Sequence, residues 1–304
     1  MVIFNQITII GMGLIGSSLA RAIMEHGVTK RLVGCDNNEK HCQTVQVLNL
    51  VDHITSDPLE AIQGSDLIIL ATPVGTYGAL GEALCPHMQA GAILTDVGSV
   101  KSNVVKSLSP YIREDCHLIP GHPVAGTEQS GPEAGFASLF DGRWCILTPP
   151  EGTDPDMVKI LEKFWQALGS KVEHMTPEHH DMVLAITSHL PHLIAYNIVG
   201  TARHLEEVTN SEVIKYSAGG FRDFTRIAAS DPTMWRDVFL NNKEAVLEML
   251  GRFSEDLTAL QRSIRYDEGD KLFELFDRNR RIRQQIIEAG QEEDVTDFGR
   301  HTEE

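Results

Sequence analysis

Several features are scarce in this 304-residue sequence, and each scarcity argues against a class of protein. The five cysteines are odd in number and form no C-x-x-C pair, which argues against disulfides and zinc and favours free thiols in a reducing compartment. No apolar run approaches the about 20 residues of a membrane-spanning helix, and the first residues lack the basic region of a secretory signal. We therefore expect a cytoplasmic protein without a membrane segment.

Basic residues are scarce relative to acidic ones. The chain has 26 Lys and Arg against 43 Asp and Glu, a formal net charge of −17 at pH 7. Such a chain repels phosphate backbones and anionic lipid surfaces, so we expect neither nucleic acid nor a membrane as a partner. Hydrophobic residues are not scarce: they make up 42% of the chain, enough to form cores. The length favours about two domains.

The first half of the chain alternates short apolar β-type runs with segments of helical period. This alternation is typical of a parallel sheet covered by helices, so we predict an α/β domain over residues 1–174. The predicted strands are residues 7–10, 32–35, 67–71, 92–96, 117–120, 145–148 and 171–175, and the predicted helices are residues 14–25, 39–48, 77–84, 100–108 and 154–168.

After Thr176 the β-type pattern disappears and helical periodicity dominates. Thr176 followed by Pro177 is typical of a helix start, and Pro191 predicts a kink or a break further along. We therefore predict an all-α domain over residues 175–290. The acidic residues 291–304 contain almost nothing apolar and are predicted to be a disordered tail.

A second helix start, Asp231-Pro232, opens the longest periodic segment of the chain. We expect Gly269 to end this segment and residues 271–287 to resume it. Its apolar residues recur in steps of four and three, so they form a seam that requires a partner helix. Packing within the chain is one interpretation, but this half is short for that task, and we favour a homodimer. The seam residues are Val246, Leu250, Phe253, Leu257, Leu260 and Ile264.

A glycine-rich motif, Gly11-Met12-Gly13-Leu14-Ile15-Gly16, lies between the first predicted strand and the first predicted helix. In this context the first glycine permits a tight turn, the second lets the backbone approach a pyrophosphate, and the third allows close packing of helix and strand. The helix N-terminus adds unpaired N–H groups. A coincidental turn is the alternative, but the surrounding pattern favours a Rossmann-type dinucleotide-binding domain.

The second predicted strand ends at Asp36, whose carboxylate can accept hydrogen bonds from ribose hydroxyls and would repel a 2′-phosphate. Asn37 and Asn38 follow it rather than a basic residue, so we predict NAD as the cofactor in preference to NADP. Thr72 and Pro73 follow another strand at the carboxyl edge of the sheet. We expect the cofactor to pass this loop, although an ordinary strand-end turn would look the same.

Oxidation of an alcohol by NAD requires a group that takes the hydroxyl proton, and histidine is best suited to this near neutral pH. Among 13 histidines, His122 stands out because it lies between Gly121 and Pro123 at a predicted strand end of the nucleotide domain. Ser99 follows the neighbouring strand and brings a hydroxyl to the same edge. A turn residue is the alternative interpretation of His122.

Five motifs in order resemble the prephenate and arogenate dehydrogenases of tyrosine biosynthesis, and the resemblance covers nearly all of residues 7–287. It implies an NAD(P)-dependent oxidative decarboxylation by a Rossmann-type domain followed by an all-α dimerisation domain. The motifs are Gly11 to Gly16, Asp96 to Ser102, Gly121 to Glu128, Ser188 to His192 and Gly219 to Arg226.

The resemblance also implies roles for individual residues. The substrate would be a cyclohexadienol with two carboxylates, of which C4 gives up hydride while the ring loses carbon dioxide and becomes a phenol. His122 would accept the proton of the C4 hydroxyl, with Ser99 orienting either the imidazole or the substrate oxygen. The guanidinium of Arg226 is the right donor for a carboxylate. The implied substrate-binding residues are Arg226, His189, His192, Thr127, Glu128, Asp223 and Trp235.

Most of these residues have a structural interpretation as well. Arg226 could be an ordinary surface cation and Trp235 a core aromatic residue. Glu128 and Asp223 could be N-caps in loops, or they could form an ionic gate with arginines. His189 and His192 share a helix face, but no third metal ligand is evident, so we expect no metal. We expect residues 178–181, which include two histidines, to form an exposed first helical turn.

Two other functions remain open. One is another two-domain NAD-dependent hydroxy-acid or imino-acid oxidoreductase, a type that typically uses Lys or a Ser/Thr pair from its helical half. The Gly-His-Pro element in the first domain disfavours it. The other is a non-catalytic NAD-sensing protein, which the presence of His122, Ser99 and Arg226 disfavours. The sequence favours neither prephenate nor arogenate, since both share the reacting ring.

Overall fold

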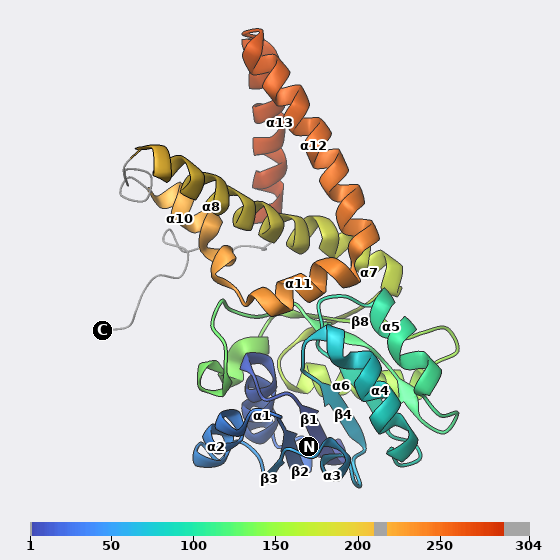
Figure 1. The fold of residues 1–304 in the computed structure, drawn as a ribbon. Coiled ribbons are helices and arrows are strands. Elements are labelled where there is room, and N and C mark those ends of the chain that lie inside the picture. Colours follow the sequence, from blue (N-terminus) through green and yellow to red (C-terminus); the bar gives the residue numbers. More distant parts are fainter. Residues whose placement is uncertain (1, 210–217, 289–304) are drawn as a thin grey trace. The chain divides into compact units, whose positions relative to one another are not determined.

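The computed structural model describes residues 2–209 and 218–288 (Figure 1). The contacts divide the chain into two units, Met1–Leu247 and Glu248–Glu304. The first unit contains all the strands of the described chain and every candidate site residue, and the second contains the end of one helix and a further helix. The predicted disordered tail, residues 291–304, lies outside the described residues.

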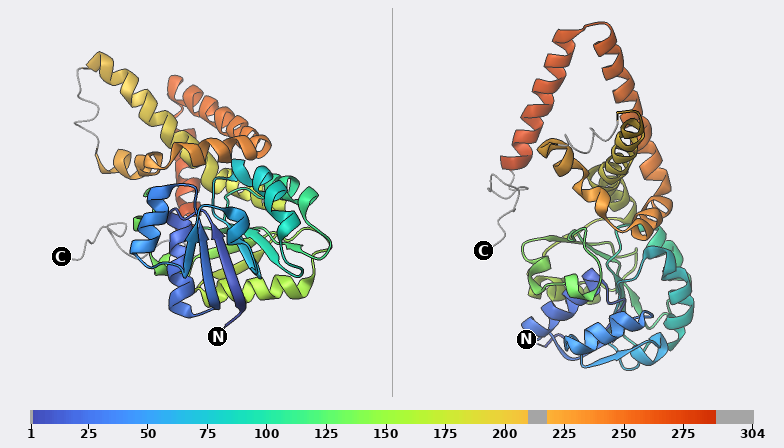
Figure 2. Two further views of the ribbon diagram at one scale, coloured as in Figure 1. Left: turned by 60° about the horizontal axis from the view of Figure 1, so that its bottom comes forward. Right: turned by 60° about the vertical axis from the view of Figure 1, so that its left-hand side comes forward.

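The first unit is built on a six-stranded parallel sheet with the strand order β3-β2-β1-β4-β5-β6. The strands lie side by side in the left view of Figure 2. The chain winds first from β1 to one side and then crosses to β4 on the other, and this reversal creates a crevice at the carboxyl ends of the two central strands. The strands are β1 (Phe4–Ile10), β2 (Thr29–Cys35), β3 (His53–Thr55), β4 (Leu67–Leu70), β5 (Ile93–Asp96) and β6 (His117–Leu118).

Helices cover both faces of this sheet, which is why β4 is buried along its whole length. Several of these helices begin where the sequence supplies a cap: Asn38 accepts from the Lys40 N–H, and Asp154 accepts from the Asp156 N–H ahead of a helix that starts with proline. The predicted helices are confirmed to within two residues at each end. They are α1 (Leu14–His26), α2 (Glu39–Val47), α4 (Tyr77–Leu84), α5 (Ser102–Leu108) and α6 (Pro155–Ala167), and the short α3 (Pro58–Ala61) joins them.

A second, three-stranded sheet was not foreseen. It consists of β7 (Gly121–Pro123), β8 (Trp144–Leu147) and β9 (Lys171–His174), with β7 and β8 antiparallel. The predicted strands near residues 145 and 171 therefore do not extend the main sheet. The Gly121 N–H donates to the carboxylate of Asp96 at the end of β5, so β7 begins at the carboxyl edge of the main sheet. This arrangement brings His122 to that edge.

The helical part of the first unit begins with α7 (Pro177–Leu184). Thr176 caps it, as predicted, by accepting from the His179 N–H. A π-helical turn, η6 (Ala185–His189), then leads without a break into α8 (Leu190–Thr209). Pro191 has no N–H to donate and its ring crowds the carbonyl four residues earlier, and the wider turn before it accommodates both effects. Of the predicted kink or break, the break does not occur.

One helical run of the described residues, Pro177–His204, is long and apolar enough to cross a membrane by length and composition alone. Only 28% of its apolar window is buried within the chain. The same run carries the buried polar side chains of His180, Asp181 and His189. It therefore packs on the nucleotide domain along one side and leaves apolar surface on the other.

Two short helical segments, α10 (Gly219–Thr225) and η7 (Arg226–Ala229), precede α11 (Pro232–Asn241). α11 packs on the loop after β4: Trp235 and Val238 join the core of the nucleotide domain, and the carboxylate of Asp237 leaves no room for a side chain at Gly75. The helical part thus lies over the carboxyl edge of the main sheet, as Figure 1 shows for α7 and α11. The long periodic segment is interrupted once, at Asn242, after which α12 (Lys243–Arg265) begins.

The second unit comprises α12 from Glu248 onward and α13 (Gly269–Glu288). The two helices run in opposite directions from the turn at residues 266–268 and separate away from it (Figure 2). Gly269 was expected to break the helix, but Asp267 adopts the left-handed conformation of the turn (φ 53°) and Gly269 begins α13. Leu257 and Ile264 of the predicted seam are 48% and 64% exposed.

Candidate active site

The glycine-rich turn between β1 and α1 has the geometry of a nucleotide-binding loop. Gly11 has a φ of +98°, and a side chain there would collide with the backbone of Ala71. A side chain at Gly16 would lie 1.9 Å from the Gly11 carbonyl oxygen, whereas nothing lies within 4 Å of the equivalent position at Gly13. Two glycines are therefore required by packing, and the third leaves the backbone open to a ligand. Met12 is fully buried, and Leu14 and Ile15 are half-buried on the first turn of α1.

Asp36 is fixed by its neighbours at the end of β2. Its Oδ2 accepts from the Met12 N–H at 2.8 Å, and its Oδ1 accepts from the Asn38 N–H at 2.8 Å. His41 Nδ1 lies 3.2 Å from the same carboxylate, a contact that the sequence analysis missed. The carboxylate thus ties the glycine-rich turn to the start of α2. A hollow of about 1010 Å³ lies along α2, lined in part by Asn38, His41 and Pro132.

Thr72 and Pro73 form the loop that follows β4. The Thr72 hydroxyl is hydrogen-bonded to that of Thr76 at 2.7 Å, and Pro73 is exposed at the start of the short helix η1 (Val74–Thr76). The backbone of Ala71 abuts Gly11, so this loop borders the glycine-rich turn.

A buried ion pair joins the ends of the two sheets. Lys101 Nζ lies 2.5 Å from Asp96 Oδ2 and donates to the Gly121 carbonyl at 2.8 Å, and both side chains are fully buried. Burial raises the pKa of Asp96 and lowers the pKa of Lys101, and their mutual attraction opposes both changes. Because Asp96 also accepts from the Gly121 N–H, the pair holds β7 against β5 and so fixes the strand that carries His122.

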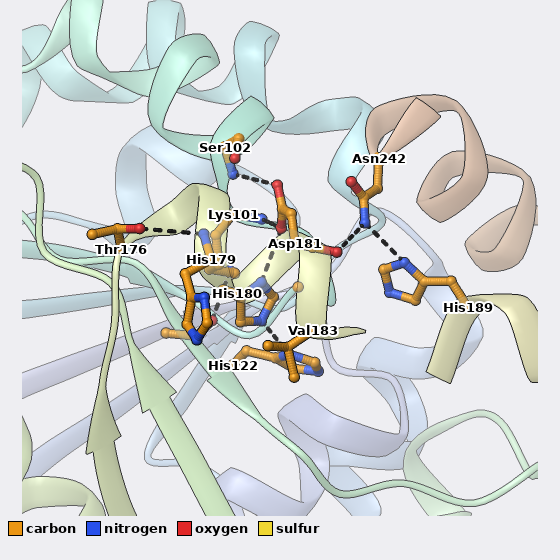
Figure 3. Close-up of polar contacts among 12 residues, drawn as sticks. Lys101, Ser102, His122, Thr176, His179, His180, Asp181, Val183, His189 and Asn242 are labelled. Carbon is orange, nitrogen blue, oxygen red and sulfur yellow. Dashed lines mark hydrogen bonds and ion pairs between the residues drawn. The ribbon is translucent and has the colours of Figure 1, made fainter. Parts of the chain in front are cut away.

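His122 is 6% exposed and heads a chain of hydrogen bonds that crosses to α7 (Figure 3). Its Nδ1 lies 2.8 Å from Nε2 of His180, and Nδ1 of His180 lies 2.9 Å from the carboxylate of Asp181. That carboxylate also accepts from two backbone N–H groups, of Lys101 at 2.7 Å and of Ser102 at 2.8 Å. His180 and Asp181 are 0% and 4% exposed, so the expected exposed first turn at residues 178–181 is wrong for these two residues.

Burial governs the charges of this chain. It lowers the pKa of His122 well below the usual value, and the nearby His180, Lys101 and His189 lower it further. Burial also lowers the pKa of His180, against the opposing effect of Asp181. Burial raises the pKa of Asp181, but the hydrogen bonds from His180, Ser102 and Lys101 outweigh it and the net pKa is lowered. Two neutral imidazoles and one carboxylate therefore stand in line at neutral pH.

A second buried imidazole, that of His189, is held by Asn242. The Asn242 amide nitrogen donates to the Asp181 carbonyl at 2.8 Å and lies 3.1 Å from His189 Nδ1 (Figure 3). Since the amide nitrogen can only donate, His189 Nδ1 accepts and its proton is on Nε2. His189 Nε2 has no hydrogen-bond partner among the described residues. Burial lowers the pKa of His189 to about 4, with His180 contributing.

Trp235 brings His189 and His192 together. The rings of His192 and Trp235 stack with their centroids 3.6 Å apart, and the His189 ring meets Trp235 edge-on at 6.1 Å. The indole N–H of Trp235 is buried and, like His189 Nε2, has no partner in the described chain. His192 Nδ1 donates to the Ser188 carbonyl, so its ring is fixed as well. Two unpartnered N–H donors thus lie on neighbouring rings.

Arg226 and Glu128 form an ion pair of 2.8 Å between η7 and the loop after β7. Arg226 is 61% exposed, and its charge lowers the pKa of His192, so the pair lies near the stacked rings. Thr127 is exposed and its hydroxyl accepts from the Gln129 N–H. Asp223 is exposed on α10. Ser99 is half-buried after β5. The backbone of Ser99 raises the pKa of His189, so Ser99 lies beside that imidazole.

The sequence analysis missed four buried polar residues of this region: His180, Asp181, Lys101 and Asn242. The helical spacing of the sequence could have indicated that His180 and Asp181 are buried. Leu184 and Ala185 lie four residues after them, so both polar residues share a helix face with apolar ones. That pattern predicts burial for the polar pair. No group of three His, Cys, Asp or Glu side chains suited to a metal ion is found in residues 2–209 and 218–288.

Comparison with known proteins gives a consistent result across most of the chain. Residues 19–174 match the family described as "Prephenate dehydrogenase, nucleotide-binding domain", and residues 176–278 match "Prephenate dehydrogenase, dimerization domain". The chain is 40% identical over 283 residues to a cyclohexadienyl dehydrogenase of Zymomonas mobilis, covering 93% of this chain and 96% of that protein. It is 32% identical to a prephenate dehydrogenase of Bacillus subtilis, covering 90% and 73% of the two chains.

Solved structures give the same picture. The crystal structure of a prephenate dehydrogenase from Aquifex aeolicus, in complex with hydroxyphenyl propionate and NAD⁺, superposes with a TM-score of 0.86 at 34% identity, covering 93% of this chain and 98% of that one. An arogenate dehydrogenase from Synechocystis superposes with a TM-score of 0.76 at 29% identity, covering 92% and 99% of the two chains.

Proposed function

The chain belongs to the prephenate dehydrogenase family, and from this premise we propose that His122 accepts the C4-hydroxyl proton while the enzyme oxidises prephenate or arogenate with NAD. The protein is an NAD-dependent oxidoreductase of this class, with a Rossmann-type domain followed by a helical domain. We assign residues 1–174 to NAD binding and residues 175–290 to the substrate and to dimerisation.

The observation that supports this role is the position and charge of His122. It is buried at the carboxyl edge of the sheet, its pKa is well below the usual value, and it is therefore neutral and able to accept a proton at physiological pH. A base acting on the C4 hydroxyl must lie beside the nicotinamide, which in this fold binds at the same edge. Ser99 follows the neighbouring strand and would orient the imidazole or the substrate oxygen.

In this mechanism the C4-hydroxyl proton moves to His122 and later returns to the same oxygen. When bound, NAD⁺ takes the hydride from C4. His122 holds the hydroxyl proton while the C4–O bond gains carbonyl character, so that the positive charge left by hydride does not build up on the ring. The bond between the ring and its carboxylate then breaks, its electron pair enters the ring, and carbon dioxide leaves. His122 returns the proton to the oxygen, which becomes the phenol hydroxyl, so no net proton is released.

The residues of the glycine-rich turn fit an NAD molecule. Gly13 leaves open space where a pyrophosphate would approach, the first turn of α1 supplies N–H groups, and Asp36 is fixed for the ribose hydroxyls. We assign Gly11, Met12, Gly13, Leu14, Ile15, Gly16, Asp36, Thr72 and Pro73 to this site.

The substrate is an anion in an acidic protein, and the site offers cations and N–H donors to hold it. Arg226 is an accessible guanidinium near the stacked rings, and its partner Glu128 can be exchanged for a substrate carboxylate. The unpartnered N–H groups of His189 and Trp235 suit oxygen acceptors of the substrate or the cofactor, because a buried donor without an acceptor is costly. We place His192, Thr127 and Asp223 at the rim of the same site.

We further propose that the protein works as a cytoplasmic homodimer. The exposed apolar residues of α12 and α13, with Leu257, Ile264 and Phe273 among them, need a partner, and the matched dimerization domain covers residues 176–278. The same need explains the apolar exposed side of Pro177–His204 without a membrane. The net charge of −17 disfavours nucleic acid and anionic lipid as partners.

Steady-state turnover of the purified protein tests the proposal most simply. We expect NADH formation with prephenate, arogenate or both, and a preference for NAD over NADP. His122→Asn should lower kcat by about 10²- to 10⁴-fold while leaving NAD affinity nearly unchanged, because the imidazole acts on the substrate proton and not on the cofactor. Retention of near wild-type kcat by His122→Asn would remove His122 from the role of base.

A further inference from the structure

We infer that His180 and Asp181 are positioning residues that fix the tautomer of His122, so that its Nε2 is the bare nitrogen that faces the substrate. The inference rests on the proposed role of His122 as the proton acceptor. Its evidence is the line of hydrogen bonds from Asp181 through His180 to His122, which joins the start of α7 to β7 (Figure 3).

The direction of every proton in this line follows from Asp181. Its carboxylate receives the backbone N–H groups of Lys101 and Ser102, and these groups can only donate. A carboxylate held by such donors is ionised and accepts hydrogen bonds only. The third contact of the carboxylate, with His180 Nδ1, therefore places a proton on that nitrogen.

The tautomer of His180 determines that of His122. A neutral His180 with its proton on Nδ1 has a bare Nε2, which can only accept, so the His122 nitrogen 2.8 Å away must donate. His122 thus carries its proton on Nδ1, and Nε2 is free to receive the proton of the substrate. If the polarity were reversed, Nε2 would carry hydrogen and could not act as a base.

The line of hydrogen bonds also stabilises the protonated form of His122, which exists while His122 holds the substrate proton. The charges around His180 are those of Asp181 on its own helix, and of Lys101 and Asp96 on the elements packed against it, with the His122 and His189 imidazoles close by. Lys101 is paired with Asp96, so Asp181 is the carboxylate that faces the histidines. An imidazolium at His122 would donate to His180 and be stabilised by that carboxylate through it, as the acidic member of a triad stabilises its histidine.

Asp181→Leu tests the direction of the line. Leucine offers His180 Nδ1 no acceptor, so the His180 proton can move to Nε2 and force His122 into the tautomer with Nε2 protonated. We expect kcat to fall by about 10²- to 10⁴-fold, with KM for the organic acid changing by less than about 3-fold, because Asp181 does not touch the substrate. His179→Leu, on the exposed neighbour, is the matched control and should leave kcat unchanged. A folded Asp181→Leu variant with wild-type kcat would overturn the inference.

Two variants of His180 separate positioning from packing. In His180→Gln the side-chain oxygen can still accept from His122 Nδ1, whereas His180→Leu fills the space without an acceptor. We expect the Gln variant to keep a kcat about 10-fold higher than the Leu variant, the value of roughly one hydrogen bond. Equal kcat values in the two folded variants would show that His180 only fills space.

Nitrogen-15 NMR of histidine-labelled wild-type protein reads the tautomers of the intact line directly. His122→Asn identifies the His122 resonances by their loss. We expect His122 and His180 each to show a protonated Nδ1 and a bare Nε2, whereas a protonated Nε2 on His122 would overturn the inference. The failures are distinguishable: normal turnover by His122→Asn refutes the proposed function, while lost turnover with a protonated Nε2 refutes the line alone.

Discussion

His122 on β7 and His180 on α7 are joined by a hydrogen bond of 2.8 Å, with their rings edge-on at 5.0 Å between centroids. His122 belongs to the part of the chain that matches a nucleotide-binding domain, and His180 belongs to the part that matches a dimerization domain. The imidazole assigned to the chemistry is therefore held by a residue of the other domain. In the proposed mechanism, neither domain alone supplies the whole hydrogen-bonded line that holds the proton acceptor.

The pH dependence of kcat/KM should reflect the burial of His122. Because burial lowers the pKa of His122 well below its usual value, the neutral and active form persists to lower pH than for an exposed histidine. We expect activity to be retained as the pH falls through about 6.5 and to decline only well below it. The measurement is kcat/KM for the organic acid from pH 8 downward, at saturating NAD. An acidic limb centred at or above about 6.5 would contradict the burial argument.

Arg226→Ala should mainly raise KM for the organic acid. In the proposed role, the guanidinium binds a carboxylate that is present in both the ground state and the transition state, so its loss should affect binding more than kcat. We expect a rise of about 10-fold or more, the value of a charge-assisted hydrogen bond. Lys159→Ala removes a cation of similar exposure on α6 and is the control. An unchanged KM in Arg226→Ala would indicate another cationic anchor.

Asp36→Ser should weaken the preference for NAD. The carboxylate is positioned by the Met12 and Asn38 N–H groups for the ribose hydroxyls, and its charge repels a 2′-phosphate. We expect KM for NAD to rise and the ratio of kcat/KM values for NAD and NADP to fall by about 10-fold or more. Glu39→Ser removes the same charge from the next helix without touching the glycine-rich turn. Equal ratios in the wild type and Asp36→Ser would remove Asp36 from this role.

Leu257→Glu should weaken the homodimer. Leu257 is 48% exposed in the predicted seam of α12, and a carboxylate buried in a subunit interface without a partner is strongly unfavourable. Light scattering coupled to size exclusion should show a monomer, or a dimer that dissociates on dilution. Val47→Glu on α2, where the side chain is 78% exposed, is the control and should leave the mass unchanged. A dimer of undiminished stability in Leu257→Glu would place the interface elsewhere.

Most of the fold could be predicted from the sequence because its signals are local. The apolar runs alternating with helices, the glycines before α1, and Thr176 ahead of Pro177 each depend on neighbours within a few residues. The split into two sheets could not be predicted this way. It depends on the hydrogen bonds of Asp96 and Lys101 with Gly121, which join strands 25 residues apart in sequence.

The candidate site was predicted in part. His122 and Ser99 were found because strand ends of a parallel sheet meet at one edge, and Arg226 was found only through the resemblance. The sequence predicts an exposed helical turn at His180 and Asp181, because polar and charged residues usually face solvent. What buries them is the surface of the nucleotide domain, with the Lys101 and Ser102 N–H groups that receive the carboxylate. Asn242 was not predicted because it lies within a long periodic segment, and its partners, the Asp181 carbonyl and His189, lie far earlier in the chain.

The claim that His122 takes the hydroxyl proton is tested most directly by a crystal structure with NAD⁺ and a substrate-like phenol or cyclohexadienol both bound. The account predicts that His122 Nε2 lies within hydrogen-bond distance of the ring oxygen, with the ring carbon that bears this oxygen facing C4 of the nicotinamide. It would be contradicted if both ligands occupied the site while the His122 imidazole pointed away from the ring oxygen.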